Sequence, residues 1–229
     1  MRRLFLVVAS LALVVAGAPA IVNADTSGGC SGATQCRTSG QGIDAAWSST
    51  PADGPVVGHV YTDTYVAAST SMTSSRGTKT PAGGLWFSQF SYIFDGLDKP
   101  TPISESFVTD FGPDLVIAVD GKLRAAKVTG TVMVVTCTYD VTLIETCGQP
   151  QPTVVNGTWT ATGPSLQVAS TFRVKGPGLL MNQMFRGTQR QATATATIGG
   201  SAVPGTPQWA SLSDSQVNSV SICHAPACF

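Results

Sequence analysis

Apolar and polar residues alternate one by one along much of the chain. In the stretch ATATATI, residues 192–198, every second residue is apolar and the threonines lie between them. Similar alternation runs through HVYTDTYV, LWFSQFSYIF, TVVNGTWTATG and LQVASTFRVK. Because successive side chains of a β-strand point to opposite faces of a sheet, this pattern predicts half-buried strands. No long stretch repeats its apolar residues at the helical spacing, so we expect helix to be scarce.

The number and spacing of these strands predict the fold class. About eight strands joined by short turns favour an all-β fold, an antiparallel meander. Long strands of low charge would aggregate through open edges, so we expect a closed barrel in preference to a sandwich. The side chains expected to be buried are Trp159, Phe172, Val132 and Val134. The threonines expected to face water are Thr193, Thr195 and Thr197.

Glycines predict where the strands turn or bend. Asp120-Gly121 is typical of a two-residue hairpin turn, because glycine readily adopts the positive φ that this turn needs. Gly130 lies inside the long apolar run 122–139 and is the expected bend. The apolar face changes register just before the ATATATI stretch, so we expect a β-bulge at Gly187.

Residues 1–24 are predicted to be a secretory signal peptide. Arg2 and Arg3 form a basic start, and Leu4–Ala16 form an apolar run too short for a membrane span. Val22-Asn23-Ala24 then offers the small residues that a signal peptidase recognises. The sequence therefore predicts a secreted protein, located outside the cell or in the cell envelope.

The remaining chain is expected to have one main domain. Residues 25–55 are rich in Gly, Ser, Thr and Pro and are predicted to form a loop-like arm. Residues 56–203 should form the antiparallel β domain, and residues 204–229 a tail with a cysteine loop.

Charge excludes two classes of partner. Charged residues make up only 11% of the chain, with 13 basic against 13 acidic side chains and no Lys/Arg cluster. This composition predicts no nucleic-acid or anionic-lipid partner. No segment after the signal peptide is apolar for long enough to predict a membrane span.

The six cysteines are predicted to form disulfides, because the chain is expected to be exported. The preferred pairs are local and join Cys30 to Cys36, Cys137 to Cys147, and Cys223 to Cys228. The main alternative cross-links the two ends of the chain, and sequence alone does not choose between connectivities. No Cys-x-x-Cys spacing is present, so no metal site and no cofactor are predicted.

Hydrolytic machinery is hard to assemble from this chain. It has two histidines, His59 and His224, and neither a G-x-S-x-G nor an H-E-x-x-H motif. Paired carboxylates from distant strands remain an alternative. The candidates are Asp63, Glu105, Asp110 and Asp120, although the last two have the surroundings of turn residues. We therefore predict that the protein is not an enzyme.

One stretch, HVYTDTY, has the side chains of a binding site. His59, Tyr61, Asp63 and Tyr65 share one strand face and could hold a small ligand, with Trp86 and Phe90 beside them. The alternative is an ordinary exposed face, with either face able to serve as the core side. The sequence favours a secreted, non-catalytic β protein with an extracellular binding or structural role. A small-molecule-binding barrel and a carboxylate-dependent hydrolase are the alternatives, and a small molecule or an extracellular partner is the possible ligand.

Overall fold

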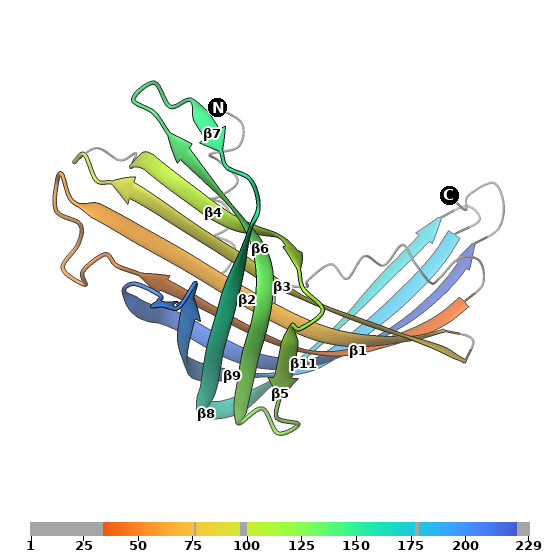
Figure 1. Cartoon of the computed structure of the whole chain (residues 1–229). Helices are drawn as coiled ribbons and strands as arrows, with labels where there is room; N and C mark the ends of the chain where they lie inside the picture. Colours follow the sequence, from red (N-terminus) through yellow and green to blue (C-terminus); the bar gives the residue numbers. More distant parts are fainter. Residues whose placement is uncertain (1–33, 76, 97–99, 177–178, 224–229) are drawn as a thin grey trace.

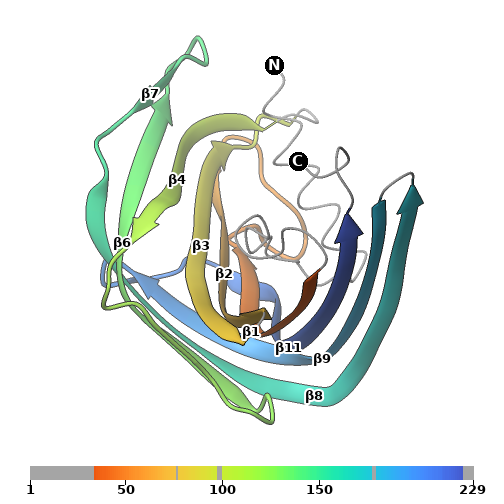
Figure 2. The ribbon, with the colours of Figure 1, turned by 90° about the vertical axis from the view of Figure 1, so that its right-hand side faces the viewer.

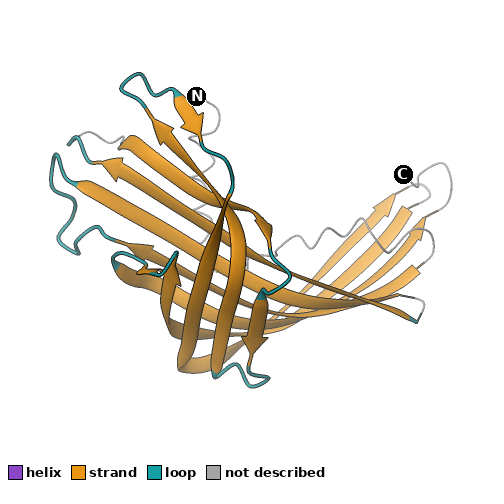
Figure 3. Cartoon of the chain, viewed as in Figure 1, coloured by secondary structure: helices purple, strands orange, loops and turns teal. Residues whose placement is uncertain are grey.

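A computed structural model describes residues 34–75, 77–96, 100–176 and 179–223 (Figure 1). These residues form eleven strands of one antiparallel sheet and contain no helix (Figure 3). The strands are β1 (Thr34–Ser48), β2 (Val60–Ser75), β3 (Thr78–Ile93), β4 (Thr101–Phe111), β5 (Val116–Val119), β6 (Ala125–Tyr139), β7 (Glu145–Cys147), β8 (Gln151–Gly176), β9 (Leu179–Ile198), β10 (Ser201–Ala202) and β11 (Thr206–Cys223). The prediction of an all-β antiparallel fold is confirmed.

The eight long strands are hydrogen-bonded in a ring. Their order is β9–β11–β1–β2–β3–β4–β6–β8, and β8 pairs with β9 again. The first part of β8 closes the ring, because Gln151–Thr160 pairs with β6 while the same strand pairs with β9. The eight strands are not spaced evenly round an axis. The sheet is thus antiparallel and ring-connected, whereas a closed barrel stays a prediction.

Parts of six strands run on beyond the ring as an open sheet, which we call the six-stranded extension (Figures 1 and 2). In spatial order it comprises residues 78–84 of β3, 69–75 of β2, 34–42 of β1, 213–223 of β11, 179–190 of β9 and 165–176 of β8. β4 pairs with β3 only from Ser88 onward, and β6 pairs with β8 only as far as Thr160. Among the described residues, the extension therefore ends in two unpaired edges, one on β3 and one on β8.

The main core fills the inside of the ring. Trp159 of β8 is buried there, and its indole N–H donates a 2.9 Å hydrogen bond to the backbone carbonyl of Asp44 on β1. At Gly157 a Cβ would lie 2.7 Å from the Trp159 ring, so this position has no room for a side chain. The bond from Trp159 to Asp44 joins β8 and β1, which are not neighbours in the ring.

The alternation in β9 has the predicted orientation. The buried alanines of the ATATATI stretch are Ala194 and Ala196, and the exposed threonines are Thr193 and Thr195. Thr197 is half-buried, so its predicted exposure is only partly met. The predicted burial of Trp159, Val132 and Val134 is confirmed.

The loop between β5 and β6 closes one end of this core. Leu123 is 2% exposed and belongs to the core, although its backbone φ is 51°. The backbone N–H of Asp120 donates to the carbonyl of Ala125, and the Asp120 carboxylate accepts a hydrogen bond from Arg124. The predicted two-residue turn at Asp120-Gly121 is therefore wrong. The loop is longer, and its positive φ falls on the residue that fills the core.

Two glycines predicted to bend strands have different outcomes. β6 changes its neighbour from β5 to β4 at Gly130, where a Cβ would lie 2.5 Å from the Cα of Leu115. The predicted bend thus lies where the backbone of Leu115 leaves no room for a side chain at position 130. The bulge predicted at Gly187 is wrong, because β9 keeps its register with β8 and β11 across this residue. The irregularity lies in β8 instead, between Ala161 and Ser165.

The predicted arm and tail are also corrected. β1 lies within the segment 25–55 that was expected to be loop-like, and β11 lies within the tail 204–229. Both are central strands, because β1 pairs with β2 and β11, and β11 pairs with β1 and β9. The sheet therefore continues across both predicted boundaries of the β domain. The predicted signal peptide lies outside the described residues.

Phe172 was expected in the core and is 52% exposed. It lies in the six-stranded extension, beyond the ring, where the alternating pattern continues without a core to cover it. The alternation predicted the strand correctly, but it did not show where the ring ends.

Candidate ligand-binding face

β2 turns one face to the main core and the other away from it. Thr64 and Val66 are buried on the core side, so Tyr61, Asp63 and Tyr65 lie on the opposite face. β3 pairs beside β2 as predicted, with Tyr92 opposite Tyr61 and Phe90 opposite Asp63. On the next strand, Glu105 of β4 lies opposite Phe90. We call this set the aromatic face: Tyr61, Asp63, Tyr65, Phe90, Tyr92 and Glu105.

Tyr61 serves mainly to hold the loop before β2. Its side chain is buried, and its hydroxyl accepts a 2.7 Å hydrogen bond from the backbone N–H of Val56. Its ring lies 6.1 Å from that of Tyr92 and 6.5 Å from that of His59. His59 itself is exposed at the end of this group. Tyr61 therefore supports the aromatic face from below, and little of its side chain is accessible to a ligand.

Asp63 is a half-buried carboxylate within the aromatic face. Burial raises its pKa, and the hydroxyls of Ser48 and Tyr92 partly offset this effect by hydrogen bonding. The Ser48 hydroxyl lies 2.6 Å from the Asp63 carboxylate, and the Tyr92 hydroxyl lies 3.2 Å from that of Thr50. Asp63 is thus held in place by neighbours from β1 and β3.

Asp63 and Glu105 lie on either side of one aromatic ring. Both are in register with Phe90, which belongs to the strand between theirs, and the Phe90 ring stacks 5.7 Å from Tyr92. Two strand spacings place the two Cα atoms about 10 Å apart. Tyr139 of β6 donates a 3.4 Å hydrogen bond to Glu105. Burial, together with the charges of Glu145 and Glu105, raises the pKa of Tyr139 to about 12.

Tyr65 and Asp44 lie next to the Asp63–Phe90–Glu105 row, and Asp44 was not a candidate from the sequence. The Tyr65 ring lies 6.0 Å from that of Trp209, and burial and the nearby Asp44 charge raise its pKa to about 12. Burial raises the pKa of Asp44 to about 6, although the Ser211 hydroxyl donates a 2.5 Å hydrogen bond to its carboxylate. Asp44 was missed because it lies in the segment predicted to be a loop-like arm. The one hint in the sequence is that Asp44 is an acidic residue within the otherwise uncharged, mostly apolar stretch GIDAAW.

The structure places Trp86 beside the aromatic face, as predicted. Trp86 is opposite Ala67, on the side of β3 that also carries Phe90, and it is 60% exposed. Two other candidates lie apart from this face. Asp110 accepts a hydrogen bond from the next backbone N–H, and Asp120 is paired with Arg124 in its loop. These two carboxylates therefore have the turn and surface roles that the sequence favoured.

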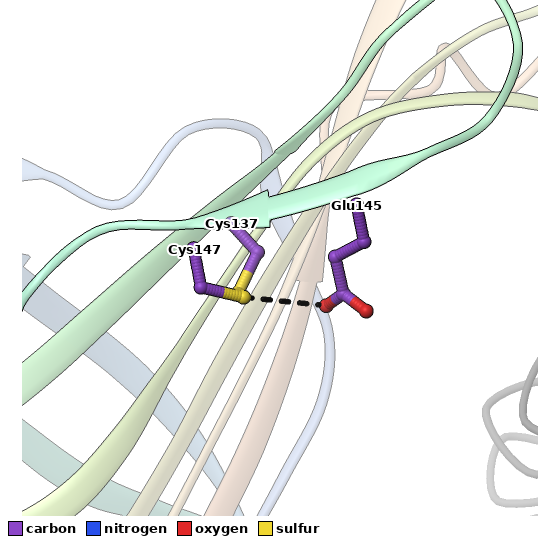
Figure 4. A group of neighbouring side chains, drawn as sticks. All are labelled: Cys137, Glu145 and Cys147. Carbon is purple, nitrogen blue, oxygen red and sulfur yellow. Dashed lines mark hydrogen bonds between the residues drawn. A yellow bond between two sulfur atoms is a disulfide. The ribbon is translucent and has the colours of Figure 1, made fainter.

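One predicted disulfide is present, between Cys137 on β6 and Cys147 on β7 (Figure 4). The Glu145 carboxylate lies 3.6 Å from the Cys147 sulfur. Because both sulfurs are bonded to each other, neither can act as a thiolate ligand, and the three side chains have no metal site in this state. Cys36 is also disulfide-bonded. The predicted pairs Cys30–Cys36 and Cys223–Cys228 each include a residue outside the described ones, so they stay predictions.

A small cleft lies elsewhere on the molecule. Its volume is about 260 Å³, and its lining includes Thr70, Phe111, Leu115 and Ile117. None of its lining residues belongs to the aromatic face. It is formed where the β4–β5 turn meets the bend of β2 and β3.

Comparisons with known proteins give no family for this chain. No protein-family model, no curated protein sequence and no solved structure matches it. In the part of the chain that the structure describes, no helix has the length and apolar character needed to cross a membrane.

Proposed function

We propose that the protein is an exported, non-catalytic binding protein whose aromatic face holds a saccharide. The observation that carries this proposal is the row Asp63–Phe90–Glu105, in which two carboxylates flank one aromatic ring. The interior of the ring is filled by the main core. The proposal therefore puts the ligand on the aromatic face and not inside a barrel.

The side chains of this row match the two surfaces of a sugar. An aromatic ring offers an apolar surface to the C–H groups of a pyranose, whereas carboxylates accept hydrogen bonds from its hydroxyls. Hydrogen bonds to a charged acceptor are about twice as strong as neutral ones, so two carboxylates can fix the orientation of the ligand. Asp63 and Tyr92 are already held by Ser48 and Thr50, which supports a preformed site.

Export is the cellular setting of this proposal. The first 24 residues have the pattern of a secretory signal peptide. The Cys137–Cys147 disulfide is compatible with an oxidising compartment outside the cytoplasm. Saccharides of cell surfaces and extracellular polymers are abundant in that setting, so ligand and location agree.

A saccharide array followed by calorimetric titration tests the proposal. We expect Phe90→Ala and Glu105→Gln each to weaken binding about tenfold or more, because each removes one side of the ligand contact, worth roughly 1.5–3 kcal/mol for the charged hydrogen bond. Phe111→Ala, at an exposed phenylalanine outside the face, and Asp110→Asn, at an exposed carboxylate outside it, are the matched controls. An array without any bound saccharide, or equal losses in the controls, would contradict the proposal.

A carboxylate-dependent hydrolase is the second candidate, supported by the raised pKa of Asp63. A carboxyl group that keeps its proton can act as a general acid, and Glu105 lies one strand beyond Phe90. Inverting glycosidases separate their carboxyl groups by roughly 6.5–9.5 Å. If this candidate is correct, the wild-type chain releases new reducing ends from a bound oligosaccharide. Asp63→Asn should then abolish release while leaving binding within about threefold, and no release by the wild type would reject the candidate.

A further inference from the structure

β8 has a free edge along the six-stranded extension. From Ser165 to Gly176 it pairs with β9 on one side, and no described strand pairs with its other side (Figure 2). The backbone N–H and C=O groups on a free edge form a template for another strand. No strand among the described residues therefore uses the backbone hydrogen-bonding groups on this side of β8.

The two edges of the extension differ in how they are protected. The edge of β3 contains Lys79, Pro81 and Gly83-Gly84, which are residues that discourage strand pairing. The edge of β8 also carries charges, at Arg173 and Lys175, but it has no proline after Pro164, and Leu166 and Phe172 on one of its faces are 64% and 52% exposed. The β8 edge therefore offers a partner an apolar, proline-free surface that the β3 edge lacks.

We propose that the β8 edge pairs antiparallel with the same edge of a second copy of this chain, with the two-fold axis at Ser170. Ser170 is the midpoint of Ser165–Lys175, so this register uses all but the last residue of the free edge. Antiparallel pairing over this length supplies about ten backbone hydrogen bonds, a usual number for a specific interface. The two extensions then join into one continuous sheet.

The side chains of β8 are self-complementary in this register. Phe172 lies opposite Val168 of the second copy, so these apolar residues cover each other twice across the axis. Arg173 lies opposite Gln167 of the second copy, and Lys175 lies opposite its Ser165. Like charges therefore do not meet. A register centred on Arg173 would place two arginines opposite each other and is disfavoured.

The chain's own N-terminal segment is a poorer partner for this edge. Residues 25–33 read DTSGGCSGA and contain no large apolar side chain to cover Leu166 or Phe172. A second copy has the same exposed Leu166 and Phe172. In a two-fold arrangement the apolar residues of each edge face apolar residues of the other. The self-pairing is thus the partner that the side chains favour.

Light scattering during gel filtration and analytical ultracentrifugation test this proposal on the oxidised chain from residue 25 onward. We expect the wild type to have twice the mass of one chain at about 50 µM, a concentration at which an interface with a Kd of about 1 µM is mostly occupied. Val168→Lys or Phe172→Glu alone should weaken the dimer about tenfold or more, because each buries an unpaired charge against an apolar residue. The double variant should recover the dimer, because the lysine at position 168 of each copy then faces the glutamate at position 172 of the other.

Mixing the two single variants gives an independent check of register. A one-to-one mixture should form a heterodimer, because the new lysine of one chain lies opposite the new glutamate of the other. Thr80→Glu, at an exposed position on the edge of β3, is the matched control and should leave the mass unchanged. A monomeric wild type overturns the proposal, as do single variants that stay dimeric or a double variant that does not recover. Dimerisation only after deletion of residues 25–33 would show that this segment occupies the edge and would also overturn it.

Discussion

Asp44 is a carboxylate whose surroundings disfavour its own charge. Burial raises its pKa to about 6, and the Ser211 hydroxyl that donates to it is itself bonded by Gln189 at 3.1 Å. Burial and the Asp44 charge raise the pKa of Tyr65 to about 12, so its hydroxyl stays neutral at ordinary pH. No cation relieves the carboxylate in the contacts of the described residues. The protonated form of Asp44 is therefore favoured by the fold.

This leads to a prediction about stability and pH. The folded pKa of about 6 exceeds the ordinary 3.8, so the folded state keeps a proton that the unfolded state loses between these values. The free energy of unfolding contributed by Asp44 therefore falls as pH rises from about 4 to about 6. Asp44→Asn should be more stable than the wild type above pH 6, by at most about 3 kcal/mol. Urea denaturation from pH 4 to 8 measures the difference, which should vanish at the acid end.

Asp120→Asn is the control for this pH series. Hydrogen bonds from Arg124 and Lys122 lower the pKa of Asp120, so its charged form favours folding. The asparagine variant should be less stable than the wild type above about pH 4, which is the opposite sign to Asp44→Asn. Parallel behaviour of the two variants would contradict the assignment of Asp44.

At the scale of elements, the β5–β6 loop contributes directly to the core. Leu123 and Leu143 both have a positive φ, of 51° and 61°, but they are 2% and 56% exposed. Leucine to alanine at each position changes the side chain on a similar backbone. We expect Leu123→Ala to lower the free energy of unfolding by about 2–5 kcal/mol and Leu143→Ala by about 0.5 kcal/mol or less. Equal effects in denaturant melts would mean that loop conformation, and not burial, determines the cost.

An element could be predicted from the sequence where its conformation follows from local residue order, but not where it depends on pairing with a distant strand. Alternation within a strand is local, so the buried alanines and exposed threonines of β9 were predicted correctly. β1 is rich in Gly, Ser and Thr and β11 is rich in Ser, and their strand conformation depends on neighbours far away along the chain. A local pattern could not show this, so the sequence predicted a loop and a tail there.

The same distinction applies to the candidate site. The shared face of Tyr61, Asp63 and Tyr65 follows from the period of a strand and could be predicted. The position of Glu105 beside Phe90 depends on the pairing of β3 with β4, which no residue spacing encodes. Sequence alone therefore suggested Asp63 and Glu105 as separate candidates without placing them in one row.

At the scale of the whole molecule, one sheet serves two purposes. The ring encloses the main core, whereas the extension carries the same strands outward without one. Figure 1 shows this as strands that are continuous from the core to the opposite end of the molecule. The proposed saccharide face and the proposed β8 pairing lie in these separate parts, so a variant of one should leave the other intact.

The pairing of β1 with β11 has a consequence for biogenesis. These strands are the first and last in the described sequence, and the hydrogen bond from Ser211 to Asp44 spans 167 residues. Contacts of such long range make a chain slow to fold, because a large loop must close before they form. If the chain is exported as proposed, N-terminus first, β1 crosses the membrane long before β11, the strand with which it pairs. Until β11 is available, β1 is an unpaired strand and could aggregate. Its many Gly, Ser and Thr residues expose little apolar surface, which lowers this risk.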